Sequence, residues 1–175
     1  AFVIAKQRGI LSGSIIFQEV FNQVNPKVQI RQHFPEGEFL QAGVTAFTLN
    51  GPMASILTGE RVALNFLGMM SGISTSTNRY VNAISHTKCK VVDTRKTTPL
   101  LRRLQKYAVE AGGGVNHRFG LYDMVLLKEN HIDVSGGIQK AVSKVKNQWN
   151  TKYKIEVETR DLSEVEEAVH AEVDC

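Results

Sequence analysis

The sequence KVVDTRKTTPLLRRLQKYAVEAGGGVNHRFGLYDMVLLK, residues 90–128, contains two short apolar runs on either side of an amphipathic helical segment. We expect a strand at residues 90–94 and another at residues 124–128. The helix between them is predicted to begin with Thr98 as its N-cap and Pro99 at its first position, because these residue types favour a helix start. Gly112 would end this helix, and its apolar face would comprise Leu100, Leu101, Leu104 and Ala108.

The same alternation continues to the end of the chain. A helix is expected around residues 138–145, a strand at residues 154–158 and a helix at residues 162–171. Strands that alternate with helices at this spacing favour a parallel β/α barrel or a doubly wound sheet. Three strands cannot close a barrel, so this part of the chain would form an incomplete one.

The N-terminal third has a different pattern. Short alternating runs broken by glycine fill residues 1–57, and residues 17–24 have helical spacing, which predicts a strand-rich sandwich with at least one helix. From Thr58, the expected N-cap, the period becomes helical, and a second helical stretch covers residues 80–84. The expected buried stripe of the first helix is Val62, Phe66, Met69, Met70 and Ile73.

The composition is that of a soluble globular protein, with 42% hydrophobic and 22% charged residues among 175. No apolar run approaches the roughly 20 residues that a membrane span needs, so no membrane partner is expected. Cys89 and Cys175 make no disulfide framework, which favours a reducing, cytoplasmic compartment. A start without Met and an abrupt end predict a piece cut from a longer protein at both ends.

Cationic side chains concentrate between residues 95 and 128, although the net charge of the whole chain is only +4. This distribution suits an anionic partner. The region has little aromatic interleaving and no nucleic-acid motif, so a small polyanion fits better than a nucleic acid.

Charged residues stand where the three predicted strands end. The first strand runs into Arg95 and Lys96, the second into Lys128 and the third into Glu158. Reactive groups of parallel β/α barrels lie at this end of the strands. These residues are therefore candidates for a site.

The last predicted strand alternates aliphatic and acidic residues. Ile155 and Val157 would pack outward on helices, which points Glu156 and Glu158 toward the barrel interior. Carboxylates are rarely buried without a partner, and the lysines that follow the first two strands, Lys96 and Lys128, are available. A salt-bridged interior without function is the alternative interpretation.

Residues 112–118, Gly-Gly-Gly-Val-Asn-His-Arg, form a second candidate cluster. Consecutive glycines permit positive φ and close backbone approach, which suits a helix stop or an oxyanion contact. His117 and Arg118 would be adjacent donors. A glycine C-cap followed by an exposed polar loop is the alternative.

Six collinear motifs between residues 60 and 158 resemble those of the quinolinate phosphoribosyltransferase family. The motifs are Glu60–Asn65, Ser71–Thr75, Asp93–Pro99, Ala111–Leu121, Leu127–His131 and Glu156–Glu158. The resemblance extends more weakly to residue 1. This chain has Glu129 where the family pattern has Asp, a change that keeps the negative charge.

The resemblance implies an α/β fold in two parts. An N-terminal α/β sandwich, residues 1–65, would precede part of an open parallel β/α barrel, about three strands, in residues 66–175. The family forms homodimers with shared active sites, in which one subunit's sandwich lies at the mouth of its partner's barrel. It transfers phosphoribosyl from phosphoribosyl pyrophosphate to quinolinate with loss of CO₂, giving nicotinate mononucleotide for NAD biosynthesis. The family's phosphate loops would lie beyond residue 175, so this chain alone is expected to be inactive.

The resemblance also assigns roles to individual residues. Arg61 would reach across the dimer to a quinolinate carboxylate, and Lys96, Lys128 and Glu158 would be catalytic. Mg²⁺ is expected to arrive with phosphoribosyl pyrophosphate, and no protein ligand to a metal is predicted. The full set expected to contact substrate is Arg61, Thr94, Arg95, Lys96, His117, Arg118, Lys128 and Glu158.

Other functions stay open. A related phosphoribosyltransferase acting on nicotinate would meet one carboxylate with more cations than it needs. Residues 36–43 resemble turns of biotinyl and lipoyl carrier domains, but residues 1–57 lack the lysine that those domains carry at a hairpin tip. An inactive fragment is the third alternative.

Overall fold

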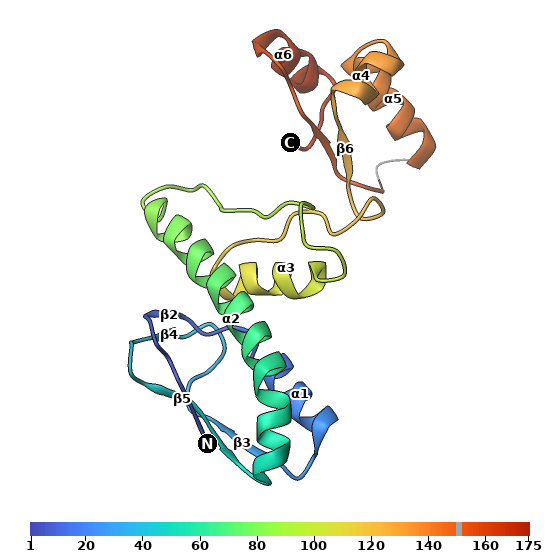
Figure 1. Cartoon of the computed structure of the whole chain (residues 1–175). Coiled ribbons are helices and arrows are strands. Elements are labelled where there is room, and N and C mark those ends of the chain that lie inside the picture. Colours follow the sequence, from blue (N-terminus) through green and yellow to red (C-terminus); the bar gives the residue numbers. More distant parts are fainter. Residues whose placement is uncertain (150–151) are drawn as a thin grey trace. The chain divides into compact units, whose positions relative to one another are not determined.

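The computed structural model describes residues 1–149 and 152–175, which divide into two compact units, residues 1–117 and residues 118–175 (Figure 1). The predicted domain boundary between residues 65 and 66 falls inside one long helix of the first unit. None of the helices in the described residues is both long and apolar enough to cross a membrane.

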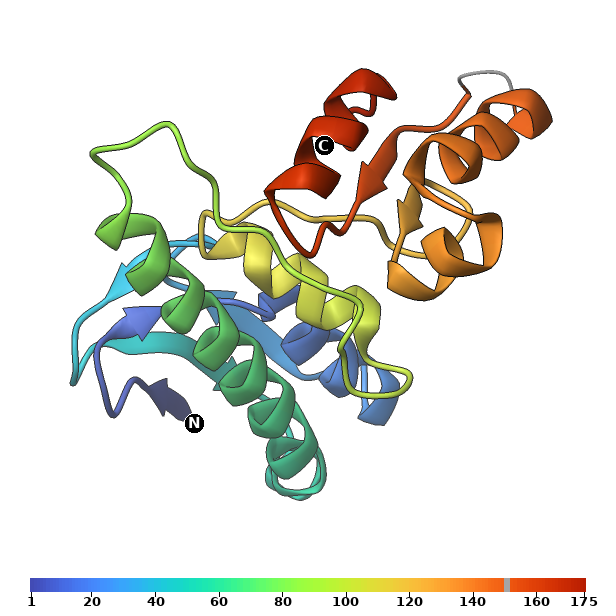
Figure 2. The same ribbon diagram turned by 90° about the horizontal axis from the view of Figure 1, so that it is seen from above.

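The first unit begins with the predicted sandwich of strands and helices. Two antiparallel sheets form, one with strand order β1-β5-β3 and one that pairs β2 with β4. Helices α1 and α2 lie side by side against them (Figures 1 and 2). The elements are β1 (Phe2–Ile4), β2 (Gly9–Ile10), α1 (Ser14–Val24), β3 (Gln29–Gln32), β4 (Phe39–Leu40), β5 (Thr45–Asn50) and α2 (Met53–Ala83).

Aromatic rings fill the space between the sheet and α1. Phe17 and Phe21 lie one turn apart on α1 and are buried, as the helical spacing predicts. The ring of Phe47, from β5, stacks on Phe17 with 4.5 Å between centroids. A Cβ on Gly59 of α2 would lie only 2.8 Å from the Phe21 ring, so glycine there permits the two helices to pack closely.

Helix α2 differs from the prediction of two separate helices. It runs unbroken over 31 residues, with Pro52 rather than Thr58 at its N-cap position. The predicted N-cap at Thr58 is wrong because this hydroxyl is already inside the helix, where Oγ1 donates to the carbonyl of Ala54 at 2.8 Å. A hydroxyl satisfied in this way does not stop a helix.

The buried stripe of α2 is also rotated from the predicted one. Of the predicted positions only Met70 is buried, and Val62 is 49% exposed. Small residues occupy much of the inner face, because the neighbouring helices approach closely there. The buried residues are Ile56, Gly59, Ala63, Leu67, Met70, Ser74 and Thr77.

Helix α3 (Arg102–Ala111) begins later than predicted. Thr98 and Pro99 form a turn instead, in which the backbone N–H of Leu101 donates to the carbonyl of Thr98 at 3.1 Å. Leu100 adopts a φ of 67° and is fully exposed, so it does not belong to the apolar face. Gly112 ends the helix as predicted.

The C-terminal end of α3 is held against α2. Ser74 Oγ, fully buried on α2, donates to the carbonyl of Ala108 at 2.6 Å. A Cβ on Gly112 would collide with the carbonyl oxygen of Ser74. Tyr107, on the more exposed side of α3, has a pKa raised above its ordinary value by partial burial and by the nearby Glu36 carboxylate.

The second unit contains a parallel pair of strands, β6 (Val125–Leu127) and β7 (Ile155–Val157). The predicted helices over 138–145 and 162–171 are present as α5 (Ile138–Trp149) and α6 (Leu162–His170), and a short helix, α4 (Glu129–Ser135), was not predicted. Ile155 and Val157 are buried in a core with α5 and α6, so the predicted alternation of β7 is confirmed.

Candidate active site

The first predicted barrel strand is reduced to a single parallel bridge between Val92 and Val115. Two backbone hydrogen bonds form this bridge. The N–H of Val115 donates to the carbonyl of Val91 at 2.8 Å, and the N–H of Asp93 donates to the carbonyl of Val115 at 3.3 Å. Residues 114–117 therefore form a parallel strand-like segment rather than the exposed loop considered above. The bridge sets the loop that begins at Thr94 beside His117.

The loop after Asp93 is fastened to the first turn of α3. Thr94 Oγ1 accepts from the backbone N–H of Lys96 at 3.1 Å. Gln105 binds Thr98 twice, accepting from its N–H and donating to its hydroxyl, both at 2.9 Å. Arg102 Nε donates to Thr97 Oγ1 at 3.1 Å. These bonds give the loop a defined conformation.

The side chains of this loop differ in their exposure to solvent. Lys96 and Thr94 are exposed, whereas Arg95 is half-buried. Arg95 Nε is buried and has no hydrogen-bond partner among the described residues. A buried N–H without a partner is costly, and a bound carboxylate would satisfy it.

A buried ion pair lies beneath this loop, and the sequence analysis missed it. Lys106, on the inner face of α3, pairs with Asp93, and their side chains are only 3% and 8% exposed. Lys106 Nζ also donates to the carbonyl of His117 at 3.0 Å. The N–H of His117 donates to Asp93 Oδ1 at 2.9 Å. The spacing of Lys106 along α3 gave no signal of this burial, because residues two positions apart do not share a helix face.

The predicted glycine cluster has a packing role. A Cβ on Gly114 would lie 2.7 Å from Val109 and 2.8 Å from Thr77. Gly113 has a φ of 89°, which favours glycine. The glycines thus allow α3, α2 and the segment before His117 to pack closely, which favours the structural interpretation of this cluster over an oxyanion contact.

Arg61 lies on the exposed surface of α2, apart from the hydrogen-bonded cluster around Asp93. In residues 1–149 and 152–175 its side chain has no hydrogen bond or ion pair. Exposed apolar side chains surround it on the same helix. They are Leu57, Val62 and Leu64, which are 59%, 49% and 37% exposed.

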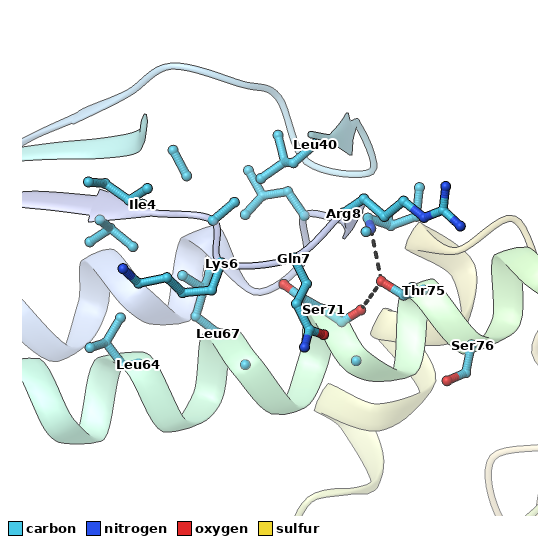
Figure 3. A pocket seen from close by; sticks show the side chains of 18 of the residues that line it. Ile4, Lys6, Gln7, Arg8, Leu40, Leu64, Leu67, Ser71, Thr75 and Ser76 are labelled. Atoms are coloured by element: carbon cyan, nitrogen blue, oxygen red, sulfur yellow. Dashed lines mark hydrogen bonds between the residues drawn. The ribbon is translucent and has the colours of Figure 1, made fainter. Parts of the chain in front are cut away.

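A cavity of about 460 Å³ lies elsewhere in the first unit, between the β1–β2 strands and α2 (Figure 3). Lys6, Arg8 and Arg79 contribute positive charge to its lining, but the predicted site residues do not line it. The Thr75 hydroxyl of the lining is engaged within the protein: Oγ1 accepts from the N–H of Ile10 at 2.9 Å and donates to the carbonyl of Ser71 at 2.7 Å. The lining therefore contains none of the side chains that are expected to contact substrate.

The second unit joins two other predicted residues. Lys128 follows β6 and Glu158 follows β7, and Lys128 Nζ lies 2.7 and 2.9 Å from the two carboxylate oxygens. Lys128 is thus the partner of Glu158. The backbone N–H of Lys128 donates to Nδ1 of His131 at 3.0 Å, which fixes the start of α4. Both side chains of the ion pair remain about half exposed, at 47% and 52%.

Arg118 begins the second unit. It is half-buried, and Nη1 lies 3.4 Å from the carbonyl of Met124. The following turn is closed by Asp123, whose carboxylate accepts from the N–H groups of Phe119 and Gly120 at 2.6 and 2.9 Å. The turn therefore holds Arg118 near the start of β6 within this unit.

Comparison with known proteins identifies the family of this arrangement. The model of the quinolinate phosphoribosyl transferase N-terminal domain matches residues 1–71, and that of the C-terminal domain matches residues 73–175. The chain belongs to the quinolinate phosphoribosyltransferase family. Its fold is accordingly an α/β sandwich followed by part of a parallel β/α barrel.

Individual members of the quinolinate phosphoribosyltransferase family are similar along the whole chain. A probable carboxylating nicotinate-nucleotide pyrophosphorylase of Bacillus subtilis is 43% identical over 99% of this chain and 60% of its own length. A chloroplastic carboxylating enzyme of Arabidopsis thaliana is 41% identical over 97% of this chain and 49% of its own. The structure of the nicotinate-nucleotide pyrophosphorylase from Francisella tularensis superposes with a TM-score of 0.97, at 45% identity, over 99% of this chain and 62% of that one.

The chain therefore spans about 60% of the length of the first of these relatives. Within that span, the structure gathers Thr94, Arg95, Lys96 and His117 in the first unit. Lys128 and Glu158 meet in the second.

Proposed function

We propose that the protein containing this chain transfers phosphoribosyl from phosphoribosyl pyrophosphate to quinolinate and releases pyrophosphate and CO₂, giving nicotinate mononucleotide. The observation that carries the proposal is a fixed group of cations in a member of this family. Arg95 has a buried Nε without a partner among the described residues, and His117 is held beside its loop. Quinolinate is a dianion, and planar guanidinium groups bind carboxylates at two points.

The residues would divide the work by substrate. Arg95, Lys96, His117 and Arg118 bind the two quinolinate carboxylates, with Thr94 contributing a backbone contact. The reaction requires the pyridine nitrogen to lie in line with the anomeric carbon of the second substrate. Nitrogen attacks that carbon as pyrophosphate leaves. The quaternised ring then stabilises the electron pair left on the ring carbon when the neighbouring carboxylate departs as CO₂, and that carbon takes up a proton from water.

Lys128 and Glu158 serve the phosphoribosyl donor. The leaving pyrophosphate is strongly anionic, and an exposed lysine can exchange its carboxylate partner for it at little cost. Glu158, once released, can hold ribose hydroxyls or stabilise the positive charge that develops on the ribose. The half-exposed geometry of the pair permits this exchange.

Mg²⁺ is part of the proposal as a companion of the donor. No group of three or more His, Cys, Asp and Glu side chains suitable for a metal occurs among the described residues. Mg²⁺ commonly binds through substrate phosphates with one or two carboxylates, and Glu158 supplies an exposed one. When bound, the ion would neutralise charge on the pyrophosphate.

We further propose a homodimer in which Arg61 completes the partner's site. Arg61 has no ion-pair partner within the described residues and lies among exposed apolar side chains of α2, a surface suited to association. A cytoplasmic location agrees with Cys89 and Cys175, which are exposed and form no disulfide in the described part of the chain.

The activity is tested on this chain continued to the full length of its relatives, called the extended protein below. We expect nicotinate mononucleotide and CO₂ in equal amounts from quinolinate and phosphoribosyl pyrophosphate, measured by chromatography and by release of labelled CO₂. Nicotinate in place of quinolinate should react poorly, because its single carboxylate leaves cations unpaired. Efficient use of nicotinate with no turnover of quinolinate would refute the proposal.

The shared site has its own test. Arg61→Ala and Lys128→Ala homodimers should both be nearly inactive. After subunit exchange, random pairing makes about half of the molecules heterodimers, each with one intact site, so activity should recover to about a quarter of wild type. Exchange of Arg61→Ala with itself is the control. No recovery after verified exchange would exclude the role of Arg61 across the dimer.

A further inference from the structure

Lys106 is among the most buried charged side chains of the described residues, with 2% of its surface exposed. Lysine is almost never buried in this way unless its ammonium group is paired. Its partners are the Asp93 carboxylate and the carbonyl of His117, which it meets at 3.0 Å. Both partners border the loops that carry the proposed quinolinate ligands.

The hydrogen bonds among these groups form a closed set. Asp93 Oδ1 accepts from Lys106 and also from the N–H of His117, at 2.9 Å in the latter case. Lys106 in turn binds the carbonyl of the same residue, His117. One ammonium and one carboxylate therefore fix both backbone groups of His117 relative to the residue that precedes the Thr94 loop.

The charge of this arrangement matters as much as its geometry. Asp93 lies two residues before Arg95, and its second oxygen, Oδ2, is buried without a partner among the described residues. Without Lys106 this carboxylate would be an uncompensated negative charge beneath a site for a dianion. It would repel the substrate and compete for the neighbouring cations.

We propose that Lys106 is a positioning residue for the carboxylate-binding half of the site. Through Asp93 it holds the Thr94 loop and His117 in fixed register, and it neutralises the acidic charge beneath them. Lys106 does not touch substrate. This inference rests on the proposed function for its substrate, and on the described hydrogen bonds for its geometry.

The test compares variants of the extended protein. Lys106→Met should raise the KM for quinolinate by roughly tenfold to a hundredfold, because small misplacements of binding groups have effects of this size. The affinity for phosphoribosyl pyrophosphate should change less than about twofold, since its proposed ligands, Lys128 and Glu158, make no bond to this cluster. Lys106→Arg, which keeps the charge and the donors, should restore most of the quinolinate affinity.

Two further variants keep the test decisive. Arg103→Met removes one positive charge from the exposed side of the same helix and should leave both affinities unchanged. If Lys106→Met does not fold, the neutral double variant Asp93→Asn/Lys106→Met carries the same expectation of a selective loss. Equal losses for both substrates would overturn the positioning role, as would an unchanged KM for quinolinate.

A measurement without substrate separates this inference from the proposed function. Amide hydrogen exchange at His117 should accelerate about tenfold or more in Lys106→Met, because the N–H loses its fixed acceptor. Exchange in α5, within the other unit, should stay the same. Unchanged exchange at His117 would overturn the inference even if quinolinate is the substrate, whereas a wild-type protein that does not bind quinolinate would overturn the proposed function alone.

Discussion

The Lys106–Asp93 pair and the Lys128–Glu158 pair join the same chemical groups in opposite surroundings. The side chains of the first are 3% and 8% exposed, and those of the second are 47% and 52% exposed. The first pair also binds backbone groups of His117, whereas Lys128 donates to both oxygens of its own partner. The two pairs therefore differ in how easily they can be separated.

Burial decides which pair is available to a ligand. Separating a buried pair leaves two poorly solvated charges, so breaking the Lys106–Asp93 contact is costly. An exposed pair exchanges its partner for water or for a substrate anion at a cost of at most about 1 kcal/mol. The same residue types thus fix backbone groups in one unit and remain accessible to a ligand in the other.

The largest effect is expected when the two lysines are removed in turn. Lys106→Met should lower the free energy of unfolding of the extended protein by about 3–5 kcal/mol, because Asp93 is left buried and unpaired. Lys128→Met should lower it by less than about 1 kcal/mol. Denaturant unfolding followed by circular dichroism gives both values. Similar losses for the two variants would contradict the conclusion that burial distinguishes the two ion pairs.

Substrate binding provides the next comparison. Arg118→Ala should weaken quinolinate binding by about 2–5 kcal/mol, because a substrate carboxylate loses its partner. Binding of phosphoribosyl pyrophosphate should change little. Calorimetry with each substrate separately measures both, with Arg103→Ala as a control for the loss of one arginine. Equal losses for the two substrates would contradict the division of ligands between the cations and the Lys128–Glu158 pair.

Some features of the fold could be predicted from local patterns in the sequence. The alternation of Ile155 and Val157 with acidic residues predicted the burial of the two aliphatic side chains of β7. Glycine after α3 predicted the end of that helix. These features depend on local periodicity and on backbone preferences, both of which can be recognised from the sequence alone.

Other features depend on contacts between distant residues. Lys106 is buried because Asp93 and His117 meet it from separate segments, so its own polarity did not indicate its burial. The buried face of α2 is rotated from the most apolar one because close packing requires small residues such as Gly59. The site roles rest on the family resemblance, since side-chain polarity alone does not specify a substrate.

Substituting Gly112, which ends α3, is expected to lower stability by less than the loss of the buried Lys106–Asp93 pair. Gly112→Ala places a Cβ against the Ser74 carbonyl and should cost about 1–3 kcal/mol of stability. Gly68→Ala, on an open face of α2, should instead stabilise by about 0.5–1 kcal/mol. The melting temperatures of both variants measure these effects. An unchanged melting temperature for Gly112→Ala would show that α2 and α3 leave room for a Cβ at this position.

The smallest effect concerns a third ion pair, between Arg160 and Glu164, at the start of α6. Glu164 Oε1 accepts from Arg160 Nε at 2.7 Å, and Oε2 accepts from the Arg160 N–H at 2.7 Å. Hydrogen bonds from the Arg160 side chain and backbone lower the pKa of Glu164 below its ordinary value of 4.5. A carboxyl group with a lowered folded-state pKa stabilises the fold above its unfolded-state value, and this contribution is lost as the pH falls through the folded-state pKa.

Glu164→Gln should therefore lower the melting temperature slightly at pH 6, and the difference from wild type should disappear as the pH falls below 4.5. Glu167→Gln, exposed on the same helix, is the matched control for the loss of one carboxylate. Thermal unfolding of the extended protein between pH 6 and pH 3 measures both. Because this pair lies at the surface, its effect should be well below that of Lys106→Met. A loss as large as that of Lys106→Met would mean that burial is not what distinguishes the ion pairs of this protein.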